Sequence, residues 1–118
     1  MTPLCAACAD DLSEVWTTLS TSHPEDRFAF LTTTQDATMR GFFGDMAAVT
    51  FATAVGNLTT KLDGLPGGNA ASFTVGGADA TDHALFLAPG AYSAGGAPLL
   101  DWLEQLVTNA PGWTSVGP

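Results

Sequence analysis

The feature that most constrains the fold is residues 27–33, a strand-like run whose centre is apolar on both faces. A strand that buries both faces is typical of a parallel sheet covered by helices on each side. A second short run, residues 71–76, carries Phe73 and Val75 on one face and ends at a Gly-Gly pair. A helical segment separates the two runs, and this order predicts a right-handed βαβ unit. The fold class is therefore α/β.

Three segments show the spacing of amphipathic helices, with apolar residues three and four positions apart. They are residues 11–20, residues 45–62 and residues 98–108. Asp11 and Glu14 resemble a capping box at the start of the first, and Pro98 suits the first position of the last. Residues 34–38 and 89–96 are expected to form a polar turn and a loop, whereas residues 84–87 fit no class.

A sheet of two parallel strands has two open edges and is marginal by itself. We therefore expect residues 1–118 to form a single partial domain, the end portion of a larger parallel sheet with flanking helices. Such a chain would expose apolar surface and bind a missing N-terminal segment or associate with itself.

The charge balance excludes some partners. Twelve acidic residues face only Arg27, Arg40 and Lys61, for a net charge of -9. The chain has almost nothing with which to neutralise phosphates, so nucleic acid is excluded and an anionic membrane surface is disfavoured. No stretch is long and apolar enough to cross a bilayer. The N-terminus also lacks a signal peptide, although this says nothing about location if the chain is a fragment.

The two cysteines, Cys5 and Cys8, form one C-x-x-C. A structural zinc site would need a second pair of ligands, and a thioredoxin-like site would need a preceding strand. A disulfide, between the two or to a missing segment, and two free thiols both remain open.

Asp36 and His83 are the candidate catalytic pair. Each follows the carboxyl end of one predicted strand, and parallel strands open their carboxyl ends on the same edge of the sheet. A carboxylate that accepts a hydrogen bond from Nδ1–H holds the imidazole so that Nε2 can take a serine proton. The order acid then histidine also fits α/β-hydrolases. The plainer alternatives are a helix N-cap for Asp36 and a solvated loop position for His83.

Other candidates are weaker. Asp79 and Asp82 beside His83 suggest a metal cluster, but no ligand-spaced partner supports it, and we expect no metal and no cofactor. His23 lies in a polar turn and reads as solvated. Ser93 lies in an A-x-S-x-G string that follows the histidine and lacks the strand and helix of a nucleophile elbow. The nucleophile is therefore expected to be absent from these residues.

Residues 27–31, together with residues 35–40 and Phe42-Phe43, resemble the strand-plus-acid segment of pectinacetylesterase-like proteins. In that family a D-x-T after the strand carries the triad aspartate, which corresponds to Asp36. Residues 82–86 resemble the family's histidine segment, with Ala84 where Thr is usual. Residues 98–103 resemble its last helix.

The resemblance implies the C-terminal portion of an α/β-hydrolase. It implies a secreted serine esterase, extracellular or periplasmic, that removes acetyl groups from a polysaccharide such as pectin, or cuts another ester, without a cofactor. Asp36 would orient His83, the general base for a serine outside this chain, so the chain alone would be inactive. The alternative is a non-catalytic acidic α/β module that binds a protein partner, with some of Trp16, Trp102 and Trp113 lining an exposed apolar face.

Overall fold

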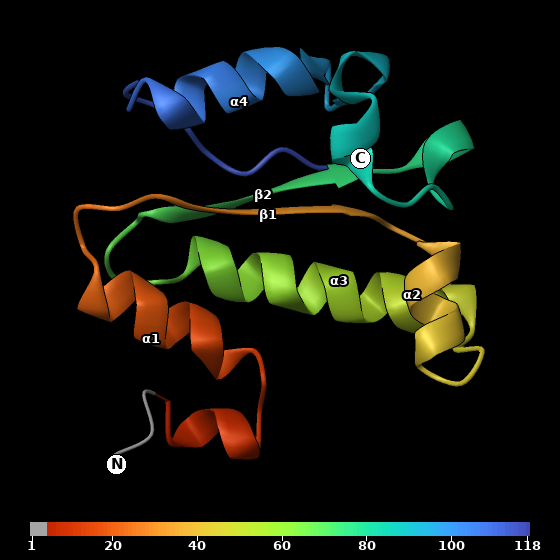
Figure 1. Cartoon of the computed structure of the whole chain (residues 1–118), viewed down its shortest axis with the longest axis horizontal. Helices are drawn as coiled ribbons and strands as arrows, with labels where there is room; N and C mark the ends of the chain where they lie inside the picture. The colour runs from red at the N-terminus through yellow and green to blue at the C-terminus, as the bar shows by residue number, and fades with distance from the viewer. Residues whose placement is uncertain (1–4) are drawn as a thin grey trace.

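The computed structural model describes residues 5–118 and has three layers (Figure 1). Two parallel strands, β1 (Phe28–Thr33) and β2 (Ala70–Val75), form the middle layer. Helices α1 (Glu14–Ser22), α2 (Ala37–Phe42) and α3 (Ala48–Asp63) lie on one face, and α4 (Leu99–Val107) lies on the other. The predicted α/β class and parallel pairing are confirmed, with Phe28 opposite Ala70 and Thr33 opposite Val75.

Both faces of the sheet are covered, as the apolar pattern of β1 requires. Phe28 and Phe30 pack toward α1 and α3, against the buried cluster of Leu62, Leu65 and Ala70. Ala29 and Leu31 pack on the opposite face, against the larger cluster around Phe73 and Trp102. All six residues of β2 are buried.

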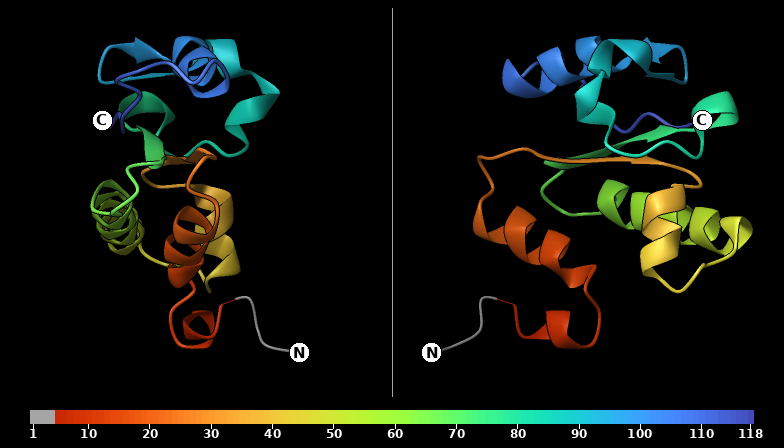
Figure 2. Two further views of the ribbon diagram at one scale, coloured as in Figure 1. Left: turned by 90° about the vertical axis from the view of Figure 1, so that its left-hand side faces the viewer. Right: turned by 45° about the vertical axis from the view of Figure 1, so that its right-hand side comes forward.

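The two edges of the sheet differ, which corrects the expectation of two open edges. The edge of β2 is covered by the C-terminal segment: Val116 donates its N–H to Ser72 and accepts the N–H of Thr74, in a parallel bridge opposite Phe73. No strand formed by residues 5–118 lies beyond β1 (Figure 2). The sheet therefore ends in one closed and one open edge.

The C-terminal segment is fastened by side chains of the core. The Arg27 guanidinium donates to the carbonyls of Gln105 and Ala110 and lies 5.2 Å from the ring centre of Trp113. Trp102 Nε1–H donates to the Thr114 carbonyl at 2.8 Å. Trp102 and Trp113 are buried, so of the three tryptophans only the half-buried Trp16 could contribute to an exposed face.

Asn69, the buried residue before β2, holds the turn that leads into β1. Its side-chain nitrogen donates to the carbonyls of Ser20, His23 and Asp26, and its oxygen accepts from the Ser20 hydroxyl. The Asn69 side-chain amide thus provides hydrogen-bond donors for the three main-chain carbonyl groups at and after the end of α1.

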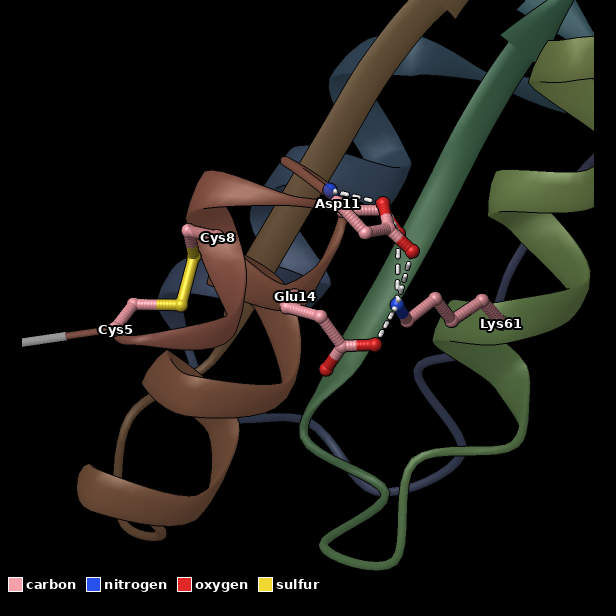
Figure 3. The surroundings of a disulfide bond; sticks show 6 residues. Cys5, Cys8, Asp11, Glu14 and Lys61 are labelled. Carbon is pink, nitrogen blue, oxygen red and sulfur yellow. Dashed lines mark hydrogen bonds and ion pairs between the residues drawn. A yellow bond between two sulfur atoms is a disulfide. The ribbon is translucent and has the colours of Figure 1, made fainter.

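The start of α1 differs from the expected capping box. Asp11 accepts hydrogen bonds from the N–H and the hydroxyl of Ser13, while Glu14 reaches Lys61 on α3 at 2.6 Å. Asp11 lies 3.7 Å from the same ammonium (Figure 3). Both carboxylates therefore form ion pairs that link the start of α1 and the turn before it to α3. Leu12, which was expected to face the core, is exposed. Cys5 and Cys8 are joined by a disulfide around a short 3₁₀ turn, η1 (Ala7–Ala9).

Further corrections concern short segments. The expected polar turn after β1 continues into α2, and residues 93–98 form a small hairpin of β3 (Ser93–Ala94) and β4 (Ala97–Pro98). Pro98 is the N-cap of α4 and not its first residue. Three further 3₁₀ turns occur at η2 (Gly77–Asp79), η3 (Leu85–Leu87) and η4 (Pro89–Ala91). None of the helices within residues 5–118 has the length and apolar character to cross a membrane.

Candidate active site

Asp36 and His83 meet at the carboxyl edge of the sheet. Asp36 lies just beyond β1 and His83 lies in the loop beyond β2. Nδ1 of His83 is 2.7 Å from Oδ2 of Asp36. Because a carboxylate only accepts hydrogen bonds, Nδ1 carries the proton in this contact and Nε2 is left unprotonated when the ring is neutral.

Each oxygen of Asp36 has its own partner. Oδ1 accepts the N–H of Met39 at 2.8 Å and caps α2, whereas Oδ2 accepts from His83. The sequence allows Asp36 to be either the N-cap of a helix or the partner of His83. In the structure it is both. The hydrogen bond from Met39 to Oδ1 orients the carboxylate, because it fixes the side chain with Oδ2 directed toward His83.

The loop that carries His83 is tied to the end of β1 by three hydrogen bonds. The N–H of Gln35 donates to Ala80 and the N–H of Ala37 donates to Thr81. The Thr33 hydroxyl donates to the Asp82 carbonyl at 2.7 Å. These contacts run on both sides of Asp36 and bring the loop to the carboxylate, so the pairing does not depend on the side chains alone.

The two members of the pair differ in exposure. The Asp36 side chain is 6% exposed, whereas the His83 side chain is 46% exposed. A buried carboxylate that holds a half-exposed imidazole leaves the far nitrogen, Nε2, available to an incoming group. This is the arrangement that a general base requires.

His83 lines the mouth of a cavity of about 640 Å³. The walls are mostly apolar and come from β1, α2, α3 and the segment after His83. Asp36, Asp82 and His83 supply the titratable groups in this lining. The volume falls within the roughly 300 to 1,000 Å³ of pockets for small molecules.

Asp82 and Tyr92 form a second polar contact beside the dyad, and their pairing was not expected from the sequence. The Tyr92 hydroxyl donates to Oδ2 of Asp82 at 3.0 Å. This hydrogen bond to a carboxylate raises the pKa of the Tyr92 phenol above its ordinary value of 10.0. The tyrosine braces the loop, since Asp82 precedes His83. The one signal for this contact in the sequence is that the chain has a single tyrosine.

The remaining candidates lie apart from the dyad. His23 is exposed and has Asp26, 3.9 Å away, as its ionic partner. Ser93 is exposed in the β3–β4 hairpin and makes no hydrogen bond with His83. Residues 5–118 contain no group of three or more side chains arranged to hold a metal ion.

Comparison of the chain with protein-family models, with curated proteins and with solved structures gave no match. Its function is therefore argued from the geometry of the site.

Proposed function

We propose that this chain is the C-terminal portion of an α/β-hydrolase and supplies the acid and the histidine of a Ser-His-Asp triad. The observation that carries the proposal is the hydrogen bond between His83 Nδ1 and Asp36 Oδ2 at the carboxyl edge of two parallel strands. Asp36 holds the tautomer and stabilises the imidazolium. His83 Nε2 takes the proton of the nucleophile and later gives it to the leaving group.

The environment of the pair supports this division of roles. Asp36 is buried and fully engaged, so it is suited to orient the ring and not to exchange protons with solvent. His83 is half exposed beside an apolar cavity, where a reacting ester could lie out of water.

The nucleophile and the oxyanion hole belong to a segment that these residues do not contain. Ser93 does not take the role, because it lies in a two-residue strand of a hairpin rather than on a strand-to-helix turn. The reaction class that follows is hydrolysis of a carboxylic ester. The resemblance to pectinacetylesterase-like proteins makes an acetylated polysaccharide the substrate to try first.

The tautomer of His83 tests the proposal directly. Imidazole ¹⁵N chemical shifts should show the Nδ1–H form for His83 at a pH where the ring is neutral. In Asp36→Asn the preference should weaken, while His23 provides an internal reference in both proteins. A dominant Nε2–H form in the unsubstituted chain would contradict the proposed base, because its lone pair would then face Asp36.

Ester turnover provides the second test. The chain alone should hydrolyse p-nitrophenyl acetate no faster than buffer does, because it lacks the nucleophile. Turnover that survives Asp36→Asn, or that disappears in Ser93→Ala, would show chemistry of a different kind.

A non-catalytic protein-binding module is the second candidate, and one observation favours it. Several large apolar side chains are exposed, and three of them, Leu12, Phe43 and Phe86, line the cavity beside β1. Exposed apolar surface of this kind marks a place where protein binds. This candidate predicts that His83→Ala changes partner binding and leaves no chemical activity to lose.

A further inference from the structure

The open edge of β1 presents unpaired main-chain groups. Phe28 and Thr34 donate their N–H groups to Asn69 and Val75, so the even-numbered residues of β1 face β2. Hydrogen-bonding direction alternates along a strand, and the N–H groups of Ala29, Leu31 and Thr33 therefore face away from β2. No atom of residues 5–118 accepts these three N–H groups. These three N–H groups recur at every second residue, as the donors that pair with a neighbouring strand do.

The apolar cavity follows the same edge. Every residue from Ala29 to Thr33 lines it, and its far wall includes Leu12, Phe43 and Phe86. These three side chains are 78%, 58% and 66% exposed. A strand in this place would pair with the main chain of β1 and cover these side chains together.

A small apolar molecule would satisfy only half of the site. It could fill the cavity, but it would leave the N–H and C=O groups of β1 with water alone. A polypeptide strand supplies both the apolar side chains and the alternating donors and acceptors. The main-chain row therefore favours a strand over a small ligand.

The charges around the edge determine what kind of strand fits. Asp36 and Asp82 line the cavity, and Asp10 lies two residues before the lining residue Leu12 in the chain. Lys61 is engaged by Glu14 and Asp11, and Arg27 by carbonyl groups on the other face of the sheet. The third cationic residue, Arg40 on α2, does not line the cavity. A second copy would bring a further net charge of -9 to this surface and meet like charge.

We propose that the β1 edge binds an extended, apolar strand with cationic ends, from a segment other than a second copy of residues 1–118. The strand pairs with Ala29, Leu31 and Thr33, and its apolar side chains occupy the cavity. Its cationic ends lie against the acidic groups at the rim. This docking does not depend on the chemistry of His83, so it stands even if the proposed hydrolase role fails.

Hydrogen exchange with a synthetic strand tests the proposal. The probe is a capped peptide of alternating Val and Thr with one Lys at each end. It should slow exchange of the Ala29 and Leu31 amides roughly tenfold, the factor that corresponds to about one net hydrogen bond. The amides of Phe30 and Thr32, already paired with β2, serve as internal references and should change little. The same peptide with Glu at each end should bind more weakly.

A proline variant separates edge pairing from other binding. Ala29→Pro removes an N–H that pairs with nothing in residues 5–118, so the fold should survive, as circular dichroism and a thermal melt will show. Peptide protection of Leu31 should then be lost. Ala29→Ser, which keeps the N–H, should bind as before.

Five results would overturn the proposal. Unchanged exchange at saturating peptide, or equal binding by Ala29→Pro, would exclude strand pairing. Protection of Ala29 and Leu31 in the free protein, together with a dimer in sedimentation, would assign the edge to a second copy. Protection in a free monomer would mean that the edge is already closed. Displacement of an apolar dye without amide protection would make the cavity a small-molecule pocket.

Discussion

At the scale of single residues, Asp36 combines two tasks that are usually assigned separately. Its Oδ1 caps the N-terminus of α2 by accepting the N–H of Met39, and its Oδ2 accepts the hydrogen bond from His83. A residue of this kind affects stability and site geometry together, so substitutions must be chosen to separate the two effects.

Asp36→Asn and Asp36→Ala are expected to differ in stability. Asn keeps an acceptor for the Met39 N–H, and it should cost about 1 kcal/mol through the weaker bond to His83. Ala removes both bonds and should cost about 2–4 kcal/mol, from the lost cap and the lost hydrogen bond of a buried carboxylate. Urea unfolding of the two variants measures this, and equal losses would contradict the double role.

Tyr92 can be followed spectroscopically, because it is the single tyrosine of the chain. Its hydrogen bond to Asp82 raises the pKa, so the phenol should titrate above 10.0. The sign follows from the protonated form being favoured in the folded state: the contribution to stability is complete below pH 10.0 and is lost as pH rises through the folded pKa. Phenolate absorbance in Asp82→Asn should show a lower midpoint. An unchanged midpoint would mean that the contact does not persist in solution.

At the scale of elements, the contact of α1 with α3 is electrostatic and should depend on pH. The hydrogen bond from Lys61 to Glu14 lowers the pKa of Glu14 below 4.5, and the same hydrogen bond raises the pKa of Lys61 above 10.5. The Glu14 contribution is present above pH 4.5 and is lost as pH falls through the folded pKa. The Lys61 contribution is present below pH 10.5 and is lost as pH rises.

Thermal melts across this range should therefore show a plateau between the two values. Glu14→Gln should reduce the loss at acid pH, and the effect should be small and weaken with added salt, because the groups are near the surface. If Glu14→Gln keeps the full loss of stability at acid pH, and added salt does not change that loss, other carboxyl groups cause it.

The turn between α1 and β1 depends on the Asn69 amide. In Asn69→Asp the side chain would face three carbonyl groups without a donor, so we expect a loss of about 3 kcal/mol in unfolding free energy. Asn57→Asp, on the exposed face of α3, is the matched control and should stay within about 0.5 kcal/mol. Similar losses in both would point to added charge rather than to the missing donor.

At the scale of the whole molecule, the elements predictable from sequence are those with long periodic patterns. The strands and α3 were predictable because residues 27–33, 71–76 and 45–62 each carry enough apolar positions to define a period. The closeness of Asp36 and His83 followed from the same pattern, because parallel strands share one edge.

Other features depend on tertiary contacts that no local pattern reveals. Val116 pairs with β2 although it lies in a Pro- and Gly-rich tail, because Trp113 is held by Arg27 from the other end of the sheet. Leu12 matches the apolar stripe of α1 but is exposed beside the open edge. Leu12 lines the cavity beside β1, a position that the pattern of neighbouring residues does not reveal.

The paired indoles give the tail an optical signature. The rings of Trp102 and Trp113 are 5.0 Å apart in a tilted arrangement, and both are buried against the same face of the sheet. Two chromophores this close couple their transitions, so near-ultraviolet circular dichroism should contain a band that neither indole produces alone. Because Trp113 belongs to the segment that covers β2, the loss of that band would time the release of the tail before the rest of the protein unfolds.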